Sequence, residues 1–130
     1  MNDSTPIDFR ELWARQLRFN ERFFRDSGLD IANLSPEEIS VRTKDFILHV
    51  EDELHELLRE TSWKMTLRCD ASEAVRSTVL EEWIDAFKFL LGLAQVWGFS
   101  PEEVLEEFRR KSKIVETRWE TRRVAKRGDP

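Results

Sequence analysis

Two pairs of carboxylates stand out because each pair lies on one side of an expected helix and borders its apolar face. Glu53 and Glu56 are three residues apart in ELHE, and Glu82 and Asp85 are three apart in EWID. Residues at this spacing are neighbours on a helix surface. The 26 residues from Glu56 to Glu82 suit an antiparallel hairpin that brings the pairs face to face. Four converging carboxylates repel one another unless a cation lies between them, and Mg²⁺ or Mn²⁺ prefers such oxygen ligands. The spacing therefore predicts a divalent metal site.

The same residue types also fit a solvated helix surface that holds no metal. Glutamates at this spacing are common on exposed faces, and Arg59 and Lys88 are available for ordinary ion pairs. A non-catalytic helical interaction module would use its carboxylates to bind a basic partner, with the side chains diverging into solvent. A metal site requires them to converge, and two such pairs on neighbouring helices favour the metal.

Four long helices follow from the apolar period and from the residues that start and stop helices. The first covers about 8–25 and is rich in Phe and Trp. The second begins behind Ser35, with Pro36 in its first turn and Glu38 completing a capping box. The third covers about 72–97 and ends at Gly98, and the fourth begins at a second SPEE, residues 100–103.

The carboxylate pairs border the apolar faces of the second and third helices. The face expected to be buried on the second helix consists of Phe46, Val50, Leu54, Leu57 and Leu58. The corresponding face on the third consists of Val79, Trp83, Ala86, Phe87, Leu90 and Leu91. Long amphipathic helices with short connections predict an all-α fold, an antiparallel four-helix bundle. We expect one domain over 1–130, with 1–7 and 121–130 flexible, and the many large apolar side chains predict a homodimer or tetramer.

Composition bounds the location and the partners of the chain. A net charge of −5 gives no basic surface of the kind that binds nucleic acid, so we expect no nucleic-acid partner. The single cysteine, Cys69, excludes an intrachain disulfide framework and fits a reducing cytoplasm. No apolar run reaches a membrane span and the first residues do not read as a signal peptide, so we expect a cytoplasmic protein without a membrane partner.

Four segments, in this order, resemble motifs of the all-α nucleoside triphosphate pyrophosphohydrolases, the group of MazG-like enzymes and dimeric dUTPases. They are most similar to the dUTPase branch, over about 16–118, and read LWARQLRFN, ELHELLRETSWK, EEWIDAFKFLLGLAQVWGF and FRRKSKIVETR. The resemblance implies that fold. It also implies Mg²⁺-dependent hydrolysis of a nucleoside triphosphate, dUTP or a related pyrimidine deoxynucleotide, to the monophosphate and pyrophosphate.

The resemblance also implies a role for each matching position. The metal ligands would be Glu53, Glu56, Glu82 and Asp85, with Glu53 also the base that takes a proton from water. The positions that address the base are Gln16, Asn20, Trp63 and Lys88, and those that hold phosphate are Lys64, Lys111 and Arg118. Three alternatives stay open: Trp63 could simply cover the hairpin end, Gln16 could be a surface residue, and the basic residues could be an ordinary solvated helix end.

Some positions depart from the pattern of the dUTPase branch. Lys88 stands where the branch has a histidine, and Ser112 and Val115 stand where it has asparagines. The histidine belongs to the base and sugar end of the pocket, so Lys88 bears on the choice of base more than on the hydrolysis. The alternative enzyme is a MazG-like house-cleaning pyrophosphatase that acts on other or modified triphosphates.

Overall fold

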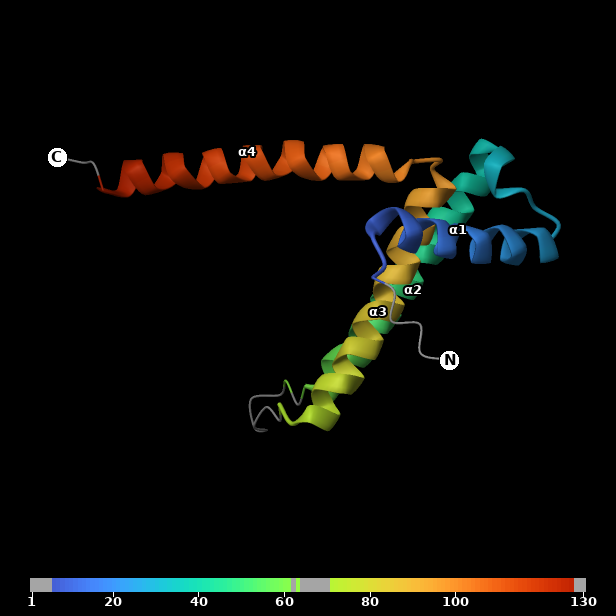
Figure 1. The fold of residues 1–130 in the computed structure, drawn as a ribbon, viewed down its shortest axis with the longest axis horizontal. Coiled ribbons are helices and arrows are strands. Elements are labelled where there is room, and N and C mark those ends of the chain that lie inside the picture. The colour runs from blue at the N-terminus through green and yellow to red at the C-terminus, as the bar shows by residue number, and fades with distance from the viewer. Residues whose placement is uncertain (1–5, 62, 64–70, 128–130) are drawn as a thin grey trace. The chain divides into compact units, whose positions relative to one another are not determined.

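All regular elements in the computed structural model, which describes residues 6–61, 63 and 71–127, are helical. They are α1 (Phe9–Asp26), the short 3₁₀ helix η1 (Ile31–Asn33), α2 (Pro36–Glu60), α3 (Glu73–Val96) and α4 (Pro101–Arg127), drawn in Figure 1. This confirms the all-α class. The chain divides into two compact units, Met1–Gly98 and Phe99–Pro130. The first holds three long helices and the second holds α4, so the four-helix bundle stays a prediction.

The helix ends follow the capping signals of the sequence. Ser35 Oγ accepts a hydrogen bond from the Glu38 N–H (3.2 Å), and Glu38 Oε2 accepts one from the Ser35 N–H (2.9 Å). Ser100 and Glu103 form the same reciprocal pair before α4, at 3.1 and 2.9 Å. Beyond α3, Gly98 has a φ of 72°, a left-handed conformation that costs glycine little. The predicted helix starts and the stop at Gly98 are confirmed.

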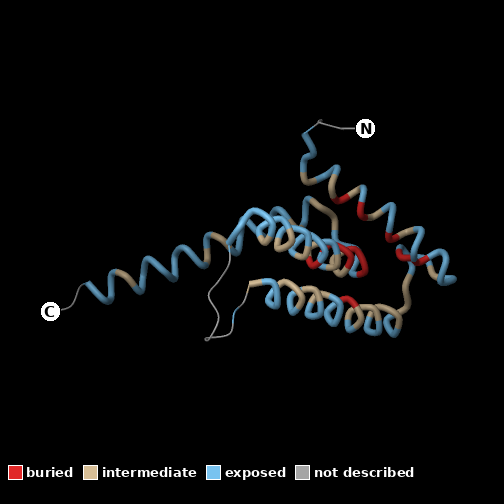
Figure 2. Tube along the Cα trace, turned by 90° about the horizontal axis from the view of Figure 1, so that it is seen from below, coloured by how far each residue is buried: buried red, intermediate tan, exposed pale blue. Residues whose placement is uncertain are grey.

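The core of the first unit lies where α1 packs against the α2–α3 hairpin. Figure 2 shows the buried residues on α1 and along the second half of α3, with one more on α2. Phe24 of α1 is fully buried and stacks on Phe46 of α2, with ring centroids 6.4 Å apart. Ile31 and Val96 complete this cluster. The core therefore fixes α1 to one end of the hairpin.

Farther along the hairpin, part of the predicted apolar face is exposed. Leu54 and Leu58 on α2 are 46% and 39% exposed, and Trp83 and Leu90 on α3 are 51% and 49% exposed. The prediction that these four are buried is therefore wrong for the unit by itself. Periodicity shows which residues share a face, but it does not show whether another element covers that face.

The second unit consists of α4 with its short leading segment. The helix runs to Arg127 and has no buried residue. Residues 121–127 belong to this helix, and their predicted flexibility stays a prediction. Exposed ion pairs one turn apart line it, such as Arg109 with Glu106 at 3.3 Å. Among the described residues, no helix combines the length and the hydropathy needed to cross a membrane.

Candidate metal centre

Three of the four predicted ligands come together between α2 and α3. Glu53 on α2 and Glu82 and Asp85 on α3 each offer a carboxylate oxygen, and these oxygens lie within 4.8 Å of one another. Glu53 and Glu82 are half-buried, while Asp85 is exposed. The half-burial of Glu53 and Glu82 follows from the sequence, because each glutamate borders the apolar side of its helix. The result is a carboxylate cluster, Glu53, Glu82 and Asp85, that is open to solvent on the side of Asp85.

Two oxygens of the carboxylate cluster are buried without a donor. The Oε2 atoms of Glu53 and Glu82 accept no hydrogen bond from any residue that the structure describes. An ionised oxygen withdrawn from water costs several kcal/mol unless a donor or a cation compensates it. Protein interiors seldom leave such groups unsatisfied. A proton or a hard divalent cation can satisfy both atoms, and carboxylate oxygens are the ligands that Mg²⁺ and Mn²⁺ prefer.

The electrostatics of the cluster favour a bound proton when no cation is present. Burial raises the pKa of Glu53 to about 7, assisted by a hydrogen bond shared with Glu82 and by the negative charges of Glu56 and Asp85. A hydrogen bond between two carboxyls needs a proton on one of them, because an ionised carboxylate can only accept. The pKa of Glu82 is also raised, first by its burial, although its hydrogen bond with Glu53 acts the other way.

Glu56, the fourth predicted ligand, lies beside the carboxylate cluster. It is half-buried, and its negative charge raises the pKa of both Glu53 and Glu82. The oxygens that meet within 4.8 Å are nevertheless those of the other three residues. Glu51 and Asp52, which precede Glu53 on α2, are exposed. The helix therefore directs only part of its acidic segment toward α3.

The predicted base-contacting amides of α1 form a buried network. Asn20 Nδ2 donates to Gln95 Oε1 at 2.8 Å, and Gln16 Nε2 donates to Asn20 Oδ1 at 3.3 Å. Gln95 Nε2 in turn donates to the carbonyl of Trp13 at 3.2 Å. The network fixes α1 to α3, and a role in contacting a base stays a prediction. Gln95 was missed in the sequence, where its one signal is an amide within the apolar run LLGLAQVWGF.

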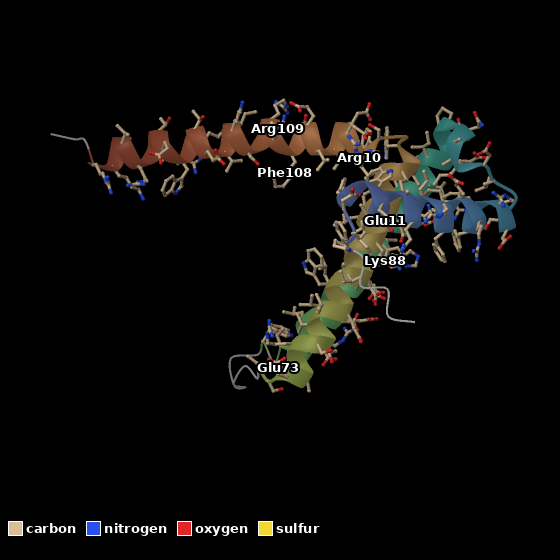
Figure 3. The ribbon with its side chains drawn as sticks, in the orientation of Figure 1. Arg10, Glu11, Glu73, Lys88, Phe108 and Arg109 are labelled. Atoms are coloured by element: carbon tan, nitrogen blue, oxygen red, sulfur yellow. The ribbon has the colours of Figure 1, made fainter. Side chains whose placement is uncertain are left out.

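The other predicted contacts lie in different places. Trp63 is exposed, and Lys88 is exposed on α3, where Figure 3 labels it. Lys64 lies outside the described residues. Lys111 and Arg118 are exposed on α4, in the second unit. The structure therefore brings together three of the four predicted metal ligands, and the base and phosphate contacts stay predictions.

Comparison with known proteins does not add to this geometry. No family model matches the chain, and neither the curated proteins nor the solved structures include a detectable match. Any functional conclusion therefore depends on the carboxylate cluster and on the sequence motifs.

Proposed function

We propose that this chain is a Mg²⁺-dependent nucleoside triphosphate pyrophosphohydrolase with Glu53, Glu82 and Asp85 as the centre of its metal site and Glu56 as a further ligand. The observation that carries the proposal is the pair of buried, donor-free Oε2 atoms of Glu53 and Glu82, close to Asp85. A helical interaction module would keep its carboxylates diverging into solvent. Convergence with unsatisfied oxygens is what a cation site needs.

The side chains of the carboxylate cluster suit hydrolysis at neutral pH. When bound, Mg²⁺ neutralises phosphate oxygens and makes water more acidic. Without metal the pKa of Glu53 is raised to about 7, and a bound cation would favour the ionised carboxylate, the form that can take a proton. It accepts the proton of the attacking water. Asp85 is exposed and lies where a phosphate group can approach from solvent.

The substrate class follows from the resemblance of the motifs. We propose dUTP or a related pyrimidine deoxynucleoside triphosphate, with the monophosphate and pyrophosphate as products. Trp63 and Lys88 are exposed and available to a base, and Lys64, Lys111 and Arg118 supply cations for the phosphates. Lys88 in place of a histidine keeps open the MazG-like alternative, a different or modified base. Exposed Leu54, Trp83 and Leu90 support the proposed homodimer or tetramer.

The decisive assay measures pyrophosphate release from a panel of deoxynucleoside triphosphates with Mg²⁺. We expect turnover that EDTA abolishes, and a loss of about 100-fold or more in Glu53→Gln and in Asp85→Asn, since each removes a charged group from the reacting centre. Glu51→Gln and Asp52→Asn are matched controls, because they remove the same charges from exposed positions of α2. They should keep wild-type activity.

Metal binding gives a readout that does not depend on the choice of nucleotide. Titration with Mn²⁺, followed by the electron paramagnetic resonance of the free ion, should show binding that Glu53→Gln weakens and Glu51→Gln leaves unchanged. If no nucleotide is hydrolysed and neither Mg²⁺ nor Mn²⁺ binds, the enzyme proposal is wrong. If Mn²⁺ binds but no nucleotide is hydrolysed, the metal site stands and the proposed reaction is wrong.

A further inference from the structure

The α4 helix carries an apolar stripe that its own unit leaves uncovered. Val104, Phe108, Val115 and Trp119 follow one another at steps of four, seven and four residues, which places them on one side of the helix. Phe108 is 74% exposed and Trp119 is 54% exposed. In Figure 3 the side chains of Phe108 and Arg109 leave α4 on different sides. A stripe of this spacing is typical of a helix that packs along another helix.

The two ends of the stripe differ in shape and in charge. Near its start, Phe99, Val104 and Phe108 line an open hollow that also borders Glu103, Glu106, Glu107 and Lys111. Near its end, Arg118, Arg122, Arg123 and Lys126 lie close to Trp119 in sequence and outnumber the two acidic residues there, Glu116 and Glu120. The guanidinium of Arg123 lies 4.6 Å from the centroid of the Trp119 ring. One end is therefore an apolar hollow with an acidic border, and the other is an aromatic side chain among cations.

We propose that α4 packs antiparallel against α4 of a second copy of this chain, with Trp119 of each copy in the hollow at Phe108 of the other. The two ends are complementary in shape and in charge, and a two-fold axis uses both ends of both copies. A parallel pair would instead bring Arg122, Arg123 and Lys126 of the two copies together, where like charges repel. Complementary charge therefore favours a second copy of α4 as the partner and an antiparallel arrangement of the two helices.

The alignment can be tested by cross-linking, because it fixes which positions lie opposite each other. With Phe108 opposite Trp119, Val104 lies opposite Arg123. In the full chain carrying Cys69→Ser, a mixture of Val104→Cys and Arg123→Cys chains should form a mixed cross-link with a short bifunctional thiol reagent. The matched mixture of Val104→Cys with Val124→Cys should give at least tenfold less, because Val124 lies on the opposite side of α4 from the stripe.

Substitution of the stripe should separate this contact from any other association of the chain. Phe108→Ser with Trp119→Ser should lower the yield of the 104–123 cross-link at least tenfold, while the control Val124→Ser, at a side chain that is 66% exposed, should not change it. Circular dichroism checks that the helices persist. The proposal is overturned by the absence of the 104–123 cross-link, by a dominant link between two Val104→Cys chains, or by a yield that the stripe substitutions leave unchanged.

The contact uses none of the carboxylate cluster. Loss of nucleotide hydrolysis or of Mn²⁺ binding would therefore leave this proposal intact, and a monomeric α4 would leave the metal site intact.

Discussion

In the proposed metal site, the carboxyl of Glu53 is the group for which a proton and a metal ion would compete. Its pKa is raised to about 7, first by burial, then by the hydrogen bond with Glu82 and the nearby negative charges. A raised pKa means that the folded chain favours the protonated carboxyl. A divalent cation instead favours the ionised carboxylate, because ligands must be deprotonated to bind it. In that proposed site, the pH would therefore determine whether a proton or a metal ion is bound.

We expect the affinity for Mn²⁺ to rise by about tenfold per pH unit below about pH 7 and to level off above it. One proton leaves Glu53 for each ion bound, which sets the slope, and above its pKa that proton is already gone. Isothermal titration calorimetry in buffers of different ionisation enthalpy measures both the affinity and the released proton. An affinity that does not change between about pH 5.5 and 8 would contradict the role of Glu53.

The stability of the metal-free chain provides the control, because it should fall with rising pH where the affinity for Mn²⁺ should rise. The stability that protonated Glu53 contributes is fully present below pH 4.5, the ordinary pKa of glutamate. It is lost as the pH rises through about 7, the raised pKa of Glu53. In EDTA, the melting temperature should therefore fall between about pH 5.5 and 8. Glu53→Gln, which stays neutral, should reduce this fall and should melt above the wild type at about pH 8. Identical pH dependence in both proteins would show that the carboxyl does not titrate as stated.

At the scale of elements, Gly92 allows α3 to approach both α1 and α2. A Cβ at this position would lie 2.7 Å from Phe46 Cε1 and 3.2 Å from Asn20 Nδ2. In an open helix, replacing glycine by alanine adds about 1 kcal/mol of stability. Here the added carbon would overlap with a core ring, and overpacking costs about 1 to 3 kcal/mol. The close contact therefore reverses the usual sign of the substitution.

We expect Gly92→Ala to lower the free energy of unfolding, measured by urea denaturation. The reason is contact with Phe46, so Phe46→Leu, which shortens the ring, should make the same alanine less costly. A double-mutant cycle gives the interaction between the two positions, with an expected value of about 1 kcal/mol. A rise in stability in Gly92→Ala alone, or a cycle with no interaction, would mean that the helices separate without cost.

The sequence predicted the elements better than it predicted their packing. Both capping boxes and the stop at Gly98 were predicted correctly, because they depend on residues within one turn of each other. The exposure of Leu54 and Trp83 was not predicted, because burial depends on what lies opposite a helix face. The bond between Asn20 and Gln95 joins residues 75 positions apart and needed the packed structure.

The candidate site could be predicted because it, too, depends on residues within one turn of a helix. Each carboxylate pair borders an apolar face at helical spacing, and a hairpin brings the two faces together. The convergence of Glu53, Glu82 and Asp85 follows from that arrangement. Side-chain rotation then decides which oxygens meet, and spacing alone does not show that Glu56 lies beside the group.

At the scale of the whole molecule, the proposed metal site and the proposed contact between α4 helices lie in different units. The carboxylate cluster and the buried core belong to Met1–Gly98, and the exposed stripe of α4 belongs to Phe99–Pro130. The proposed phosphate contacts Lys111 and Arg118 also belong to the second unit. Metal binding should therefore be separable from nucleotide hydrolysis by removing the second unit.

A chain that ends at Gly98 is expected to fold and to bind Mn²⁺ within about threefold of the full chain, since none of the clustered oxygens comes from α4. Its hydrolysis should fall by about tenfold or more through KM, because charge-assisted contacts to phosphate contribute about 1.5 to 3 kcal/mol. In the full chain, Lys111→Ala with Arg118→Ala should reproduce this loss, and the exposed Arg122→Ala should not. Lost Mn²⁺ binding in a truncated chain with native circular dichroism would show that α4 helps form the metal site. An unchanged KM in these variants would show that Lys111 and Arg118 do not contact the phosphates. The one role then proposed for α4 would be association.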